Sequence, residues 1–427
     1  MYLVRYLEPG TVVYHVLRVL VPGTWYQVPG RQSPGASRYI PENNGTCQLC
    51  TWYLVLVPGT MAWLVSFWLP PFYKISFRVS GRLTVTKNLI AFMEMTAKVA
   101  LMSAMAASTN MMERTILCSD GISLAAQHYI SDSINSRSSN LTPTKILCLH
   151  GWLDNCRSFW KLAPALAQSG GEVVALDFPG HGLSSHKSKD GTPLLLSEGA
   201  YYVAEAVQAL EWDSFVLVGH SMGAAVSVVY AAAFPDQVSK LVLLEGGGPL
   251  TRQPKDTAKH IRSHIEKRLT GNRALYDPSS TKGPRLYPSL EKAIETRRKT
   301  AQLAPGKQYL SEAAAREMVI RAVTIADNHG ANGTGGVQFR HDPRLQWPSL
   351  QYYTDEQNDA IFQDIQCPVC LLLSKDGWPI QEDKLIKTKE LLQPQSMHIL
   401  PGSHHFHADP DDADAVLEHV LEFVDER

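Results

Sequence analysis

The chain has 427 residues, of which 44% are hydrophobic and 19% are charged, and its 40 Lys and Arg nearly balance its 41 Asp and Glu. This composition is typical of a globular protein and excludes a collagen, a fully disordered chain and a polybasic nucleic-acid-binding protein. The charge is uneven, because residues 1–110 carry nine Lys or Arg and three Asp or Glu, which leaves a net charge of −7 on the rest. The length allows two or three domains.

Residues 1–110 differ in composition from everything after them. They hold four of the nine tryptophans and repeat a short Pro-Gly phrase, so we expect a leader outside the folded core, disordered or used for targeting, or even translated repeat DNA upstream of the true start. Asn43–Tyr73 has no charged residue, but Pro58-Gly59 and Pro70-Pro71 interrupt it, so a membrane span is not expected. Ala91–Asn110 is similar to an organelle-targeting or signal segment, which predicts a cytoplasmic or organellar protein.

From Met111 onward, short β-branched apolar runs alternate with segments of helical periodicity, which predicts an α/β protein with a mostly parallel, doubly wound sheet. Asp120-Gly121 predicts the turn of an antiparallel hairpin at its start. The expected buried strands are Lys145–Leu149, Val173–Asp177, Phe215–Val218, Leu241–Leu244, Pro368–Leu373 and Met397–Leu400. The expected helices between them are Arg157–Gln168, Glu198–Trp212, Met222–Phe234 and Asp411–Phe423.

One connection, residues 246–366, is too long for an ordinary crossover and contains no convincing buried strand. Amphipathic helices are expected instead at Asp256–Leu269, Ser289–Leu303 and Tyr309–Asn328. Because ligands bind at the carboxyl edge of such sheets, we interpret this insertion as a cap over that edge, with a separate helical domain as the alternative. The core then consists of residues 111–245 and 367–427.

The seven cysteines do not indicate a disulfide framework, because they are odd in number and spread through a long chain. Cys367 and Cys370 have C-x-x-C spacing but lead into a buried strand, so we interpret them as small buried hydrophobic residues. No metal cluster, phosphate-binding loop or dinucleotide fingerprint is evident, so neither a metal nor a cofactor is expected.

The strongest chemical signal is Gly219-His-Ser-Met-Gly223, a G-x-S-x-G stretch between a strand and a helical run. That context predicts a nucleophile elbow, in which a strained turn presents Ser221 at a helix N-terminus. Glycine at both flanking positions removes side chains that would collide with the strand and the helix. Ser221 is therefore the candidate nucleophile.

A serine hydroxyl needs a base and a group that orients the base, and an elbow requires the chain order Ser, acid, His. Asp376 follows the next-to-last strand and is the favoured acid, with Glu245 at the end of an earlier strand as the alternative. His404, His405 and His407 follow the last strand. The spacing of this loop favours His404 as the base over His405, with His407 in a second histidine position.

The oxyanion of a tetrahedral intermediate needs two N–H donors, one from the residue after the nucleophile and one from the loop after the third strand. Met222 and Trp152 are the candidates. Other polar residues at the strand exits, His150, His181 and Ser184, are expected to be structural.

Together, His150-Gly-Trp-Leu-Asp-Asn155, Asp177–Ser185, Gly219–Gly223 and Gly402–His407 resemble the α/β-hydrolase superfamily, specifically its serine hydrolase-like proteins. A cap segment, Phe339-Arg-His-Asp-Pro-Arg-Leu, is also similar to that subgroup, and the resemblance covers residues 115–427. It implies an α/β-hydrolase fold and a cofactor-independent hydrolase. Relatives that open epoxides or cleave carbon–halogen bonds use aspartate at the elbow, so Ser221 favours acyl transfer.

We therefore expect a serine hydrolase that cleaves a small to medium acyl ester through Ser221, His404 and Asp376. The alternatives are a non-catalytic scaffold that binds a ligand, and a lyase or carbon–carbon hydrolase that uses the same elbow. The expected partner is a small acyl substrate and not a nucleic acid. Aromatic residues of the cap and of the acid loop, which could line its pocket, are Trp347, Tyr352, Tyr353 and Trp378.

Overall fold

The computed structural model describes residues 52–56, 62–69, 73–80, 109–131, 142–189, 191–276, 285–326 and 336–426. The chain divides into two compact units, Met1–Ala104 and Met105–Arg427. None of the helices in these ranges combines the length and the apolar character that crossing a bilayer requires.

The first unit contains a three-stranded antiparallel sheet. Its strands are β1 (Trp52–Leu56), β2 (Ala62–Leu69) and β3 (Tyr73–Ser80), in the order β1-β2-β3. These strands lie within residues 1–110, the expected leader, and are rich in the aromatic and β-branched types that favour strands. The segment Ala91–Asn110 lies outside the described residues as far as Ser108.

The second unit is built on an eight-stranded sheet with the order β14-β13-β9-β8-β6-β7-β5-β4. β4 and β5 form the expected antiparallel hairpin, with Gly121 at a φ of 87° in its turn. The other six strands, β6, β7, β8, β9, β13 and β14, run parallel to one another. The strands are β4 (Thr109–Leu117), β5 (Ser123–Ser131), β6 (Thr144–Leu149), β7 (Gly171–Leu176), β8 (Phe215–His220), β9 (Val238–Leu244), β13 (Val369–Ser374) and β14 (Ser396–Leu400).

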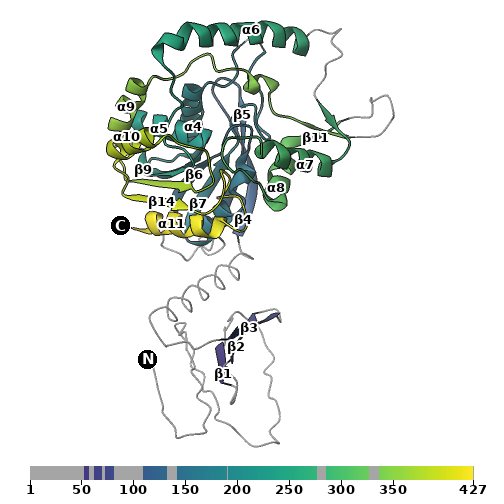
Figure 1. The fold of residues 1–427 in the computed structure, drawn as a ribbon, viewed down its shortest axis with the longest axis vertical. Helices are drawn as coiled ribbons and strands as arrows, with labels where there is room; N and C mark the ends of the chain where they lie inside the picture. Colours follow the sequence, from purple (N-terminus) through teal and green to yellow (C-terminus); the bar gives the residue numbers. More distant parts are fainter. Residues whose placement is uncertain are drawn as a thin grey trace, which may run out of the picture. The chain divides into compact units, whose positions relative to one another are not determined.

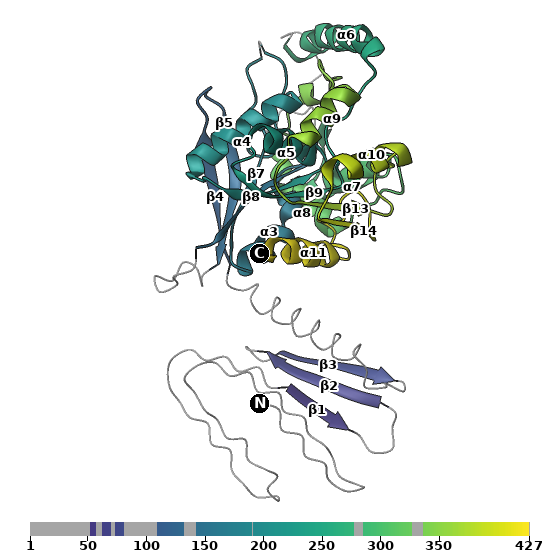
Figure 2. The ribbon, with the colours of Figure 1, turned by 90° about the vertical axis from the view of Figure 1, so that its left-hand side faces the viewer.

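Helices cover both faces of this sheet (Figures 1 and 2). α4 (Leu196–Leu210) and α5 (Met222–Ala233) pack on one face, and α3 (Leu162–Gln168) and α11 (Ala413–Asp425) lie together on the other. All four confirm expected helices, although the first begins with a separate 3-10 turn, η2 (Cys156–Phe159). α10 (Glu382–Leu392), between β13 and β14, was not expected.

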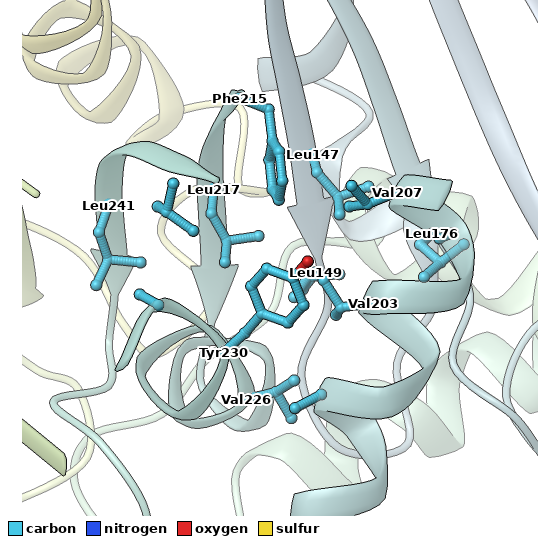
Figure 3. Close-up of a cluster of buried hydrophobic side chains, with 14 of the residues drawn as sticks. Leu147, Leu149, Leu176, Val203, Val207, Phe215, Leu217, Val226, Tyr230 and Leu241 are labelled. Atoms are coloured by element: carbon cyan, nitrogen blue, oxygen red, sulfur yellow. The ribbon is translucent and has the colours of Figure 1, made fainter. Parts of the chain in front are cut away.

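The main core lies between the sheet and the α4–α5 pair. Leu147 and Leu149 of β6 and Leu217 of β8 are fully buried against Val203 of α4 and Tyr230 of α5 (Figure 3). Each such side chain contributes about 1.5–3 kcal/mol relative to an exposed position. This core fixes the strand ends from which the candidate site is built.

The segment between β9 and β13 contains the three expected helices, together with one further helix (Asp355–Gln363) and one small sheet that were not expected. The helices are α6 (Thr257–Tyr276), α7 (Leu290–Ala301), α8 (Glu312–Ala322) and α9 (Asp355–Gln363), with 3-10 turns η3 (Pro254–Asp256) and η4 (Pro343–Gln346). α8 ends at Ala322 and not near Asn328, because the β-branched run Val323-Thr-Ile is extended and forms β11 (Val323–Ala326). β11 and β10 (Leu286–Tyr287) both pair with β12 (Gly336–Phe339). We call residues 246–366 the cap.

Two buried arginines of the cap contact loops and strands of the eight-stranded sheet. Arg321 of α8 donates to Asp177 at 2.8 Å and to Glu113 at 2.7 Å. Arg344 in η4 donates to Asp342 and to the carbonyls of Lys187 and Ser188. Because the Arg321 and Asp177 side chains are only 5% and 0% exposed, this ion pair between the cap and the loop after β7 is shielded from solvent.

Candidate functional site

Ser221 lies at the sharp turn between β8 and α5 and has φ 52° and ψ −112°, a strained backbone for a residue with a side chain. A Cβ on Gly219 would lie 2.5 Å from the Gly223 carbonyl oxygen, and one on Gly223 would lie 2.1 Å from that of Leu149. Both positions therefore require glycine. The geometry is that of the expected nucleophile elbow, and it lifts Ser221 to the N-terminus of α5.

The carboxylate beside His404 is Glu245. The Nδ1 of His404 lies 3.0 Å from Oε2 of Glu245, whose side chain is 3% exposed. Glu245 follows β9, next to β8 in the sheet, and the Ser221 N–H donates to the Leu244 carbonyl at 2.9 Å. The nucleophile turn and the acid are thereby fixed to each other through the backbone.

This geometry favours Glu245, the alternative acid, over Asp376. Asp376 does follow β13 as expected, but its side chain is 37% exposed and its ionic contact is with Lys307 Nζ at 4.0 Å. Its backbone N–H donates to the Gly402 carbonyl at 3.0 Å, so the residue supports the base loop through its main chain. Order along the chain cannot separate the two carboxylates, since β9 and β13 are neighbours in the sheet and both precede His404.

Glu245 is held as an ionised acceptor. Burial alone would raise the pKa of its carboxyl, but hydrogen bonds from His404 and from the N–H groups of Ser374 and Trp378 hold the pKa below its ordinary value. Gly377 permits this arrangement, because a Cβ there would lie 2.2 Å from Oε2 of Glu245. An ionised Glu245 that accepts from Nδ1–H leaves the other ring nitrogen of His404 as a proton acceptor.

His404 is fixed through its main chain. Its N–H donates to Oε1 of Gln308 at 2.9 Å, and its carbonyl accepts from Nε2 of His220 at 2.8 Å. His220 is fully buried, and burial holds its pKa well below the ordinary value, so the imidazole is neutral and donates from Nε2. The second residue of the elbow motif, His220, thus positions the base loop.

The alternative base, His405, occupies a different environment. Its Nε2 lies 3.0 Å from Oδ2 of Asp154, and burial lowers its pKa. His407 is fully buried, and in the described residues neither of its ring nitrogens has a hydrogen-bond partner. Its ring packs against His220 at a centroid distance of 4.1 Å and against Phe159 at 5.3 Å. Of the three histidines, His404 is the one paired with Glu245.

The two candidate oxyanion donors lie at the expected strand exits. Met222 is the first residue of α5, where a backbone N–H has no partner within the helix. Trp152 lies in the loop after β6, where Leu153 has a φ of 61° and the Asp154 N–H donates to the Gly151 carbonyl at 3.2 Å. Among the described residues, no backbone carbonyl accepts from the N–H of either residue.

The polar residues expected to be structural, His150, His181 and Ser184, are buried and hydrogen-bonded. His150 Nε2 accepts from the Phe178 N–H at 3.1 Å, and burial lowers its pKa to about 4. Ser184 donates from Oγ to the Asp177 carbonyl at 2.6 Å and accepts from the Ala125 N–H at 2.8 Å. His181 is fully buried, and burial lowers its pKa to about 3.

The four cap and loop aromatics divide into two groups. Trp378 is 46% exposed, and its ring centroid lies 5.9 Å from that of His404. Trp347 instead packs against His264 and Gly271 of α6, and Tyr352 contacts His260 and Arg252. The carbonyl of Tyr353 accepts from the Arg252 N–H at 2.8 Å. Of these two groups, Trp378 is the one in contact with the candidate base.

Five of the seven cysteines lie in the described part of the chain. Cys118, Cys148, Cys156, Cys367 and Cys370 are free thiols there. Burial raises the pKa of Cys367 and of Cys370 to about 11, so both are thiols at neutral pH. In the same ranges, no three His, Cys, Asp or Glu side chains are arranged to hold a metal ion.

The sequence is similar to a family model and to several known proteins. A family model described as the alpha/beta hydrolase fold matches residues 145–275, which include the elbow. A serine hydrolase-like protein of Dictyostelium discoideum is 30% identical over 290 residues, covering 66% of this chain and 74% of that relative. Another from Danio rerio is 34% identical over 235 residues, which are 54% of this chain and 65% of that relative.

Two solved structures are also similar. A hypothetical protein from Pseudomonas aeruginosa PAO1 has a TM-score of 0.61 and 30% sequence identity, with 74% of this chain and 99% of that chain covered. The thioesterase domain from the curacin biosynthetic pathway has a TM-score of 0.55 at 21% identity, with 73% and 99% covered, and shares the fold.

Proposed function

Since the chain belongs to the α/β-hydrolase superfamily, and within it to the serine hydrolase-like proteins, we propose that it hydrolyses small to medium acyl esters. Ser221 is the nucleophile, His404 the general base and Glu245 the acid that orients the base. The observation that supports this proposal is the 3.0 Å contact between His404 and Glu245 beside the strained elbow.

The reaction begins with attack of Ser221 Oγ on the ester carbonyl carbon, while the hydroxyl proton moves to Nε2 of His404. Glu245 remains ionised and holds Nδ1–H of the resulting imidazolium. The N–H groups of Met222 and Trp152 donate to the oxyanion, which is worth about 2.7–4 kcal/mol for one donor in related sites.

The tetrahedral intermediate then collapses. The bond to the leaving alkoxide breaks, His404 returns the proton to the leaving oxygen, and the acyl group stays on Ser221 as an ester. A water molecule attacks this ester and gives its proton to His404. Collapse of the second intermediate releases the carboxylic acid and restores the Ser221 hydroxyl.

A fluorophosphonate probe tests the nucleophile directly. The wild-type protein should be labelled and should hydrolyse members of a panel of esters, thioesters and amides, and Ser221→Ala should lose both activities. Ser349→Ala, which removes a hydroxyl from a cap loop, is the matched control and should behave as wild type. Equal labelling of Ser221→Ala and the wild type would refute the proposal, as would folded wild-type protein that is neither labelled nor active on any member.

A further inference from the structure

A buried ion pair between Asp154 and Arg297 contacts His405, the residue that follows the candidate base. The Asp154 side chain is 3% exposed and accepts from Nη2 of Arg297 at 2.7 Å and from Nε2 of His405 at 3.0 Å. Nη2 of Arg297 also lies 3.2 Å from Nε2 of His405. The carboxylate of Asp154, the guanidinium of Arg297 and the imidazole of His405 therefore lie within hydrogen-bond distance of one another.

These three residues belong to three separate parts of the fold. Asp154 lies in the loop after β6 that carries Trp152, and His405 directly follows His404 in the loop after β14. Arg297 lies on helix α7 of the cap. The contact therefore joins a candidate oxyanion loop and the base loop to the cap.

Arg297 also balances a charge that would otherwise oppose the reaction. Burial would raise the pKa of the Asp154 carboxyl, but His405 and Arg297 hold that pKa well below its ordinary value, so Asp154 is ionised. In the described residues, Arg297 is the only Lys or Arg within 4.0 Å of this carboxylate. Without it, an uncompensated buried anion would lie in the loop whose backbone is to stabilise a developing oxyanion.

The connection between α7 and α8 makes further contacts with the same site. Gln308 accepts from the His404 N–H at 2.9 Å, and Oγ of Ser403 donates to the Tyr309 carbonyl at 2.7 Å. Gly306 comes so close that a Cβ there would lie 2.2 Å from the carbonyl oxygen of Gly377, the residue beside Glu245. The cap thus touches the loops of both the acid and the base.

We propose that Arg297 is a positioning residue of the hydrolytic site. Through Asp154 and His405 it holds the oxyanion loop and the base loop in their working arrangement, so the site is complete only with helix α7 in place. This inference rests on the proposed function, because it assigns Arg297 its role through His404.

The test compares Arg297→Met with Lys299→Met in the full chain, using an ester that the wild type hydrolyses. Lys299 lies on the same helix, is 69% exposed and pairs with Glu295. Because a misplacement of about 1 Å can cost roughly 10²-fold in rate, Arg297→Met should lower kcat by about that factor with KM changed less than about threefold. Lys299→Met should leave both constants unchanged.

Two further readouts separate positioning from a general loss of structure. Guanidinium at millimolar concentration should raise the kcat of Arg297→Met severalfold and leave Lys299→Met unchanged, because it can refill the place beside Asp154. A double-mutant cycle with Asp154→Asn should be strongly non-additive, since the two residues act through one contact.

The proposal is overturned if Arg297→Met keeps a kcat within about threefold of wild type, if the loss lies only in KM, or if guanidinium has no effect and the cycle is additive. Should Arg297→Met fail to fold, Arg297→Gln takes its place, and an unchanged kcat in that variant has the same meaning. Ser221-dependent labelling of the wild type is measured first, so a failure of the proposed function is seen separately.

Discussion

The assignment of the acid gives the sharpest prediction. Glu245→Gln removes one charge and keeps the shape of the side chain, but no orientation of the amide satisfies its neighbours. Oε2 of Glu245 accepts from His404 and Trp378, and Oε1 accepts from the Ser374 N–H. An NH2 group in either position faces a backbone N–H donor, that of Trp378 in the first and that of Ser374 in the second. Only the first position also offers an acceptor, His404 Nδ1, so we expect that orientation, and it forces the imidazole proton onto Nε2.

The expected loss follows from this tautomer. With a proton on Nε2, His404 cannot accept from Ser221, and loss of the orienting carboxylate in comparable triads costs about 10⁴-fold in kcat. We expect a loss of about 10³–10⁴-fold for Glu245→Gln, equivalent to about 4–5.4 kcal/mol of transition-state stabilisation. Asp376→Asn should change kcat less than about threefold, since its exposed side chain makes only a weak ionic contact with Lys307.

The assay measures kcat and KM on one ester together with the second-order rate of fluorophosphonate labelling, after circular dichroism has shown that both variants are folded. A large loss in Asp376→Asn together with near-normal activity in Glu245→Gln would refute the reasoning from the hydrogen bonds. Equal large losses in both variants would mean that Asp376 acts through more than its main chain.

Three more predictions concern the acid pocket, the cap and pH. Gly377→Ala places a methyl group 2.2 Å from Oε2 of Glu245, so it should lose most esterase activity while remaining folded by circular dichroism. Arg321→Met breaks a buried pair with Asp177 and should reduce the free energy of unfolding by about 3–5 kcal/mol, seen as a lower Tm; an unchanged Tm would contradict it. The third prediction is that stability falls between about pH 6.5 and pH 4, because His150 binds a proton near pH 6.5 when unfolded and only at about 4 when folded. Acid therefore favours the unfolded chain, and a Tm that stays constant over this range would contradict the prediction.

Much of the fold could be predicted because its signals are local. The apolar run before Gly219 and the alanine-rich run after it define a strand and a helix by composition alone, and both form where expected. The small cap sheet was missed because β10 has two residues and β12 has four, too few for a visible alternation. α10 was missed because it is amphipathic and mostly exposed, like many polar segments that are not helical.

The candidate site was only partly predictable for a different reason. Ser221 can be recognised from the sequence because Gly219 and Gly223 lie two residues before and two residues after it. Neither position has room for a side chain, so the fold requires glycine at both. The choice between Glu245 and Asp376 depends on which carboxylate reaches His404, and that is decided by side-chain direction at two adjacent strand ends. Arg297 carries no sequence signal, since an arginine on a charged cap helix resembles any other until the fold brings it to Asp154.

The pairing of Ser221 and Glu245 on neighbouring strands has a consequence for how this protein can change. Both residues precede the cap in the chain, and the Ser221 N–H bonded to the Leu244 carbonyl fixes one to the other without any cap residue. The insertion can therefore be replaced by one of another length or specificity while the nucleophile and acid stay in register. A grafted cap would still have to place a cation beside Asp154, where Arg297 lies in this protein. A chimera should therefore keep a basic residue at that place.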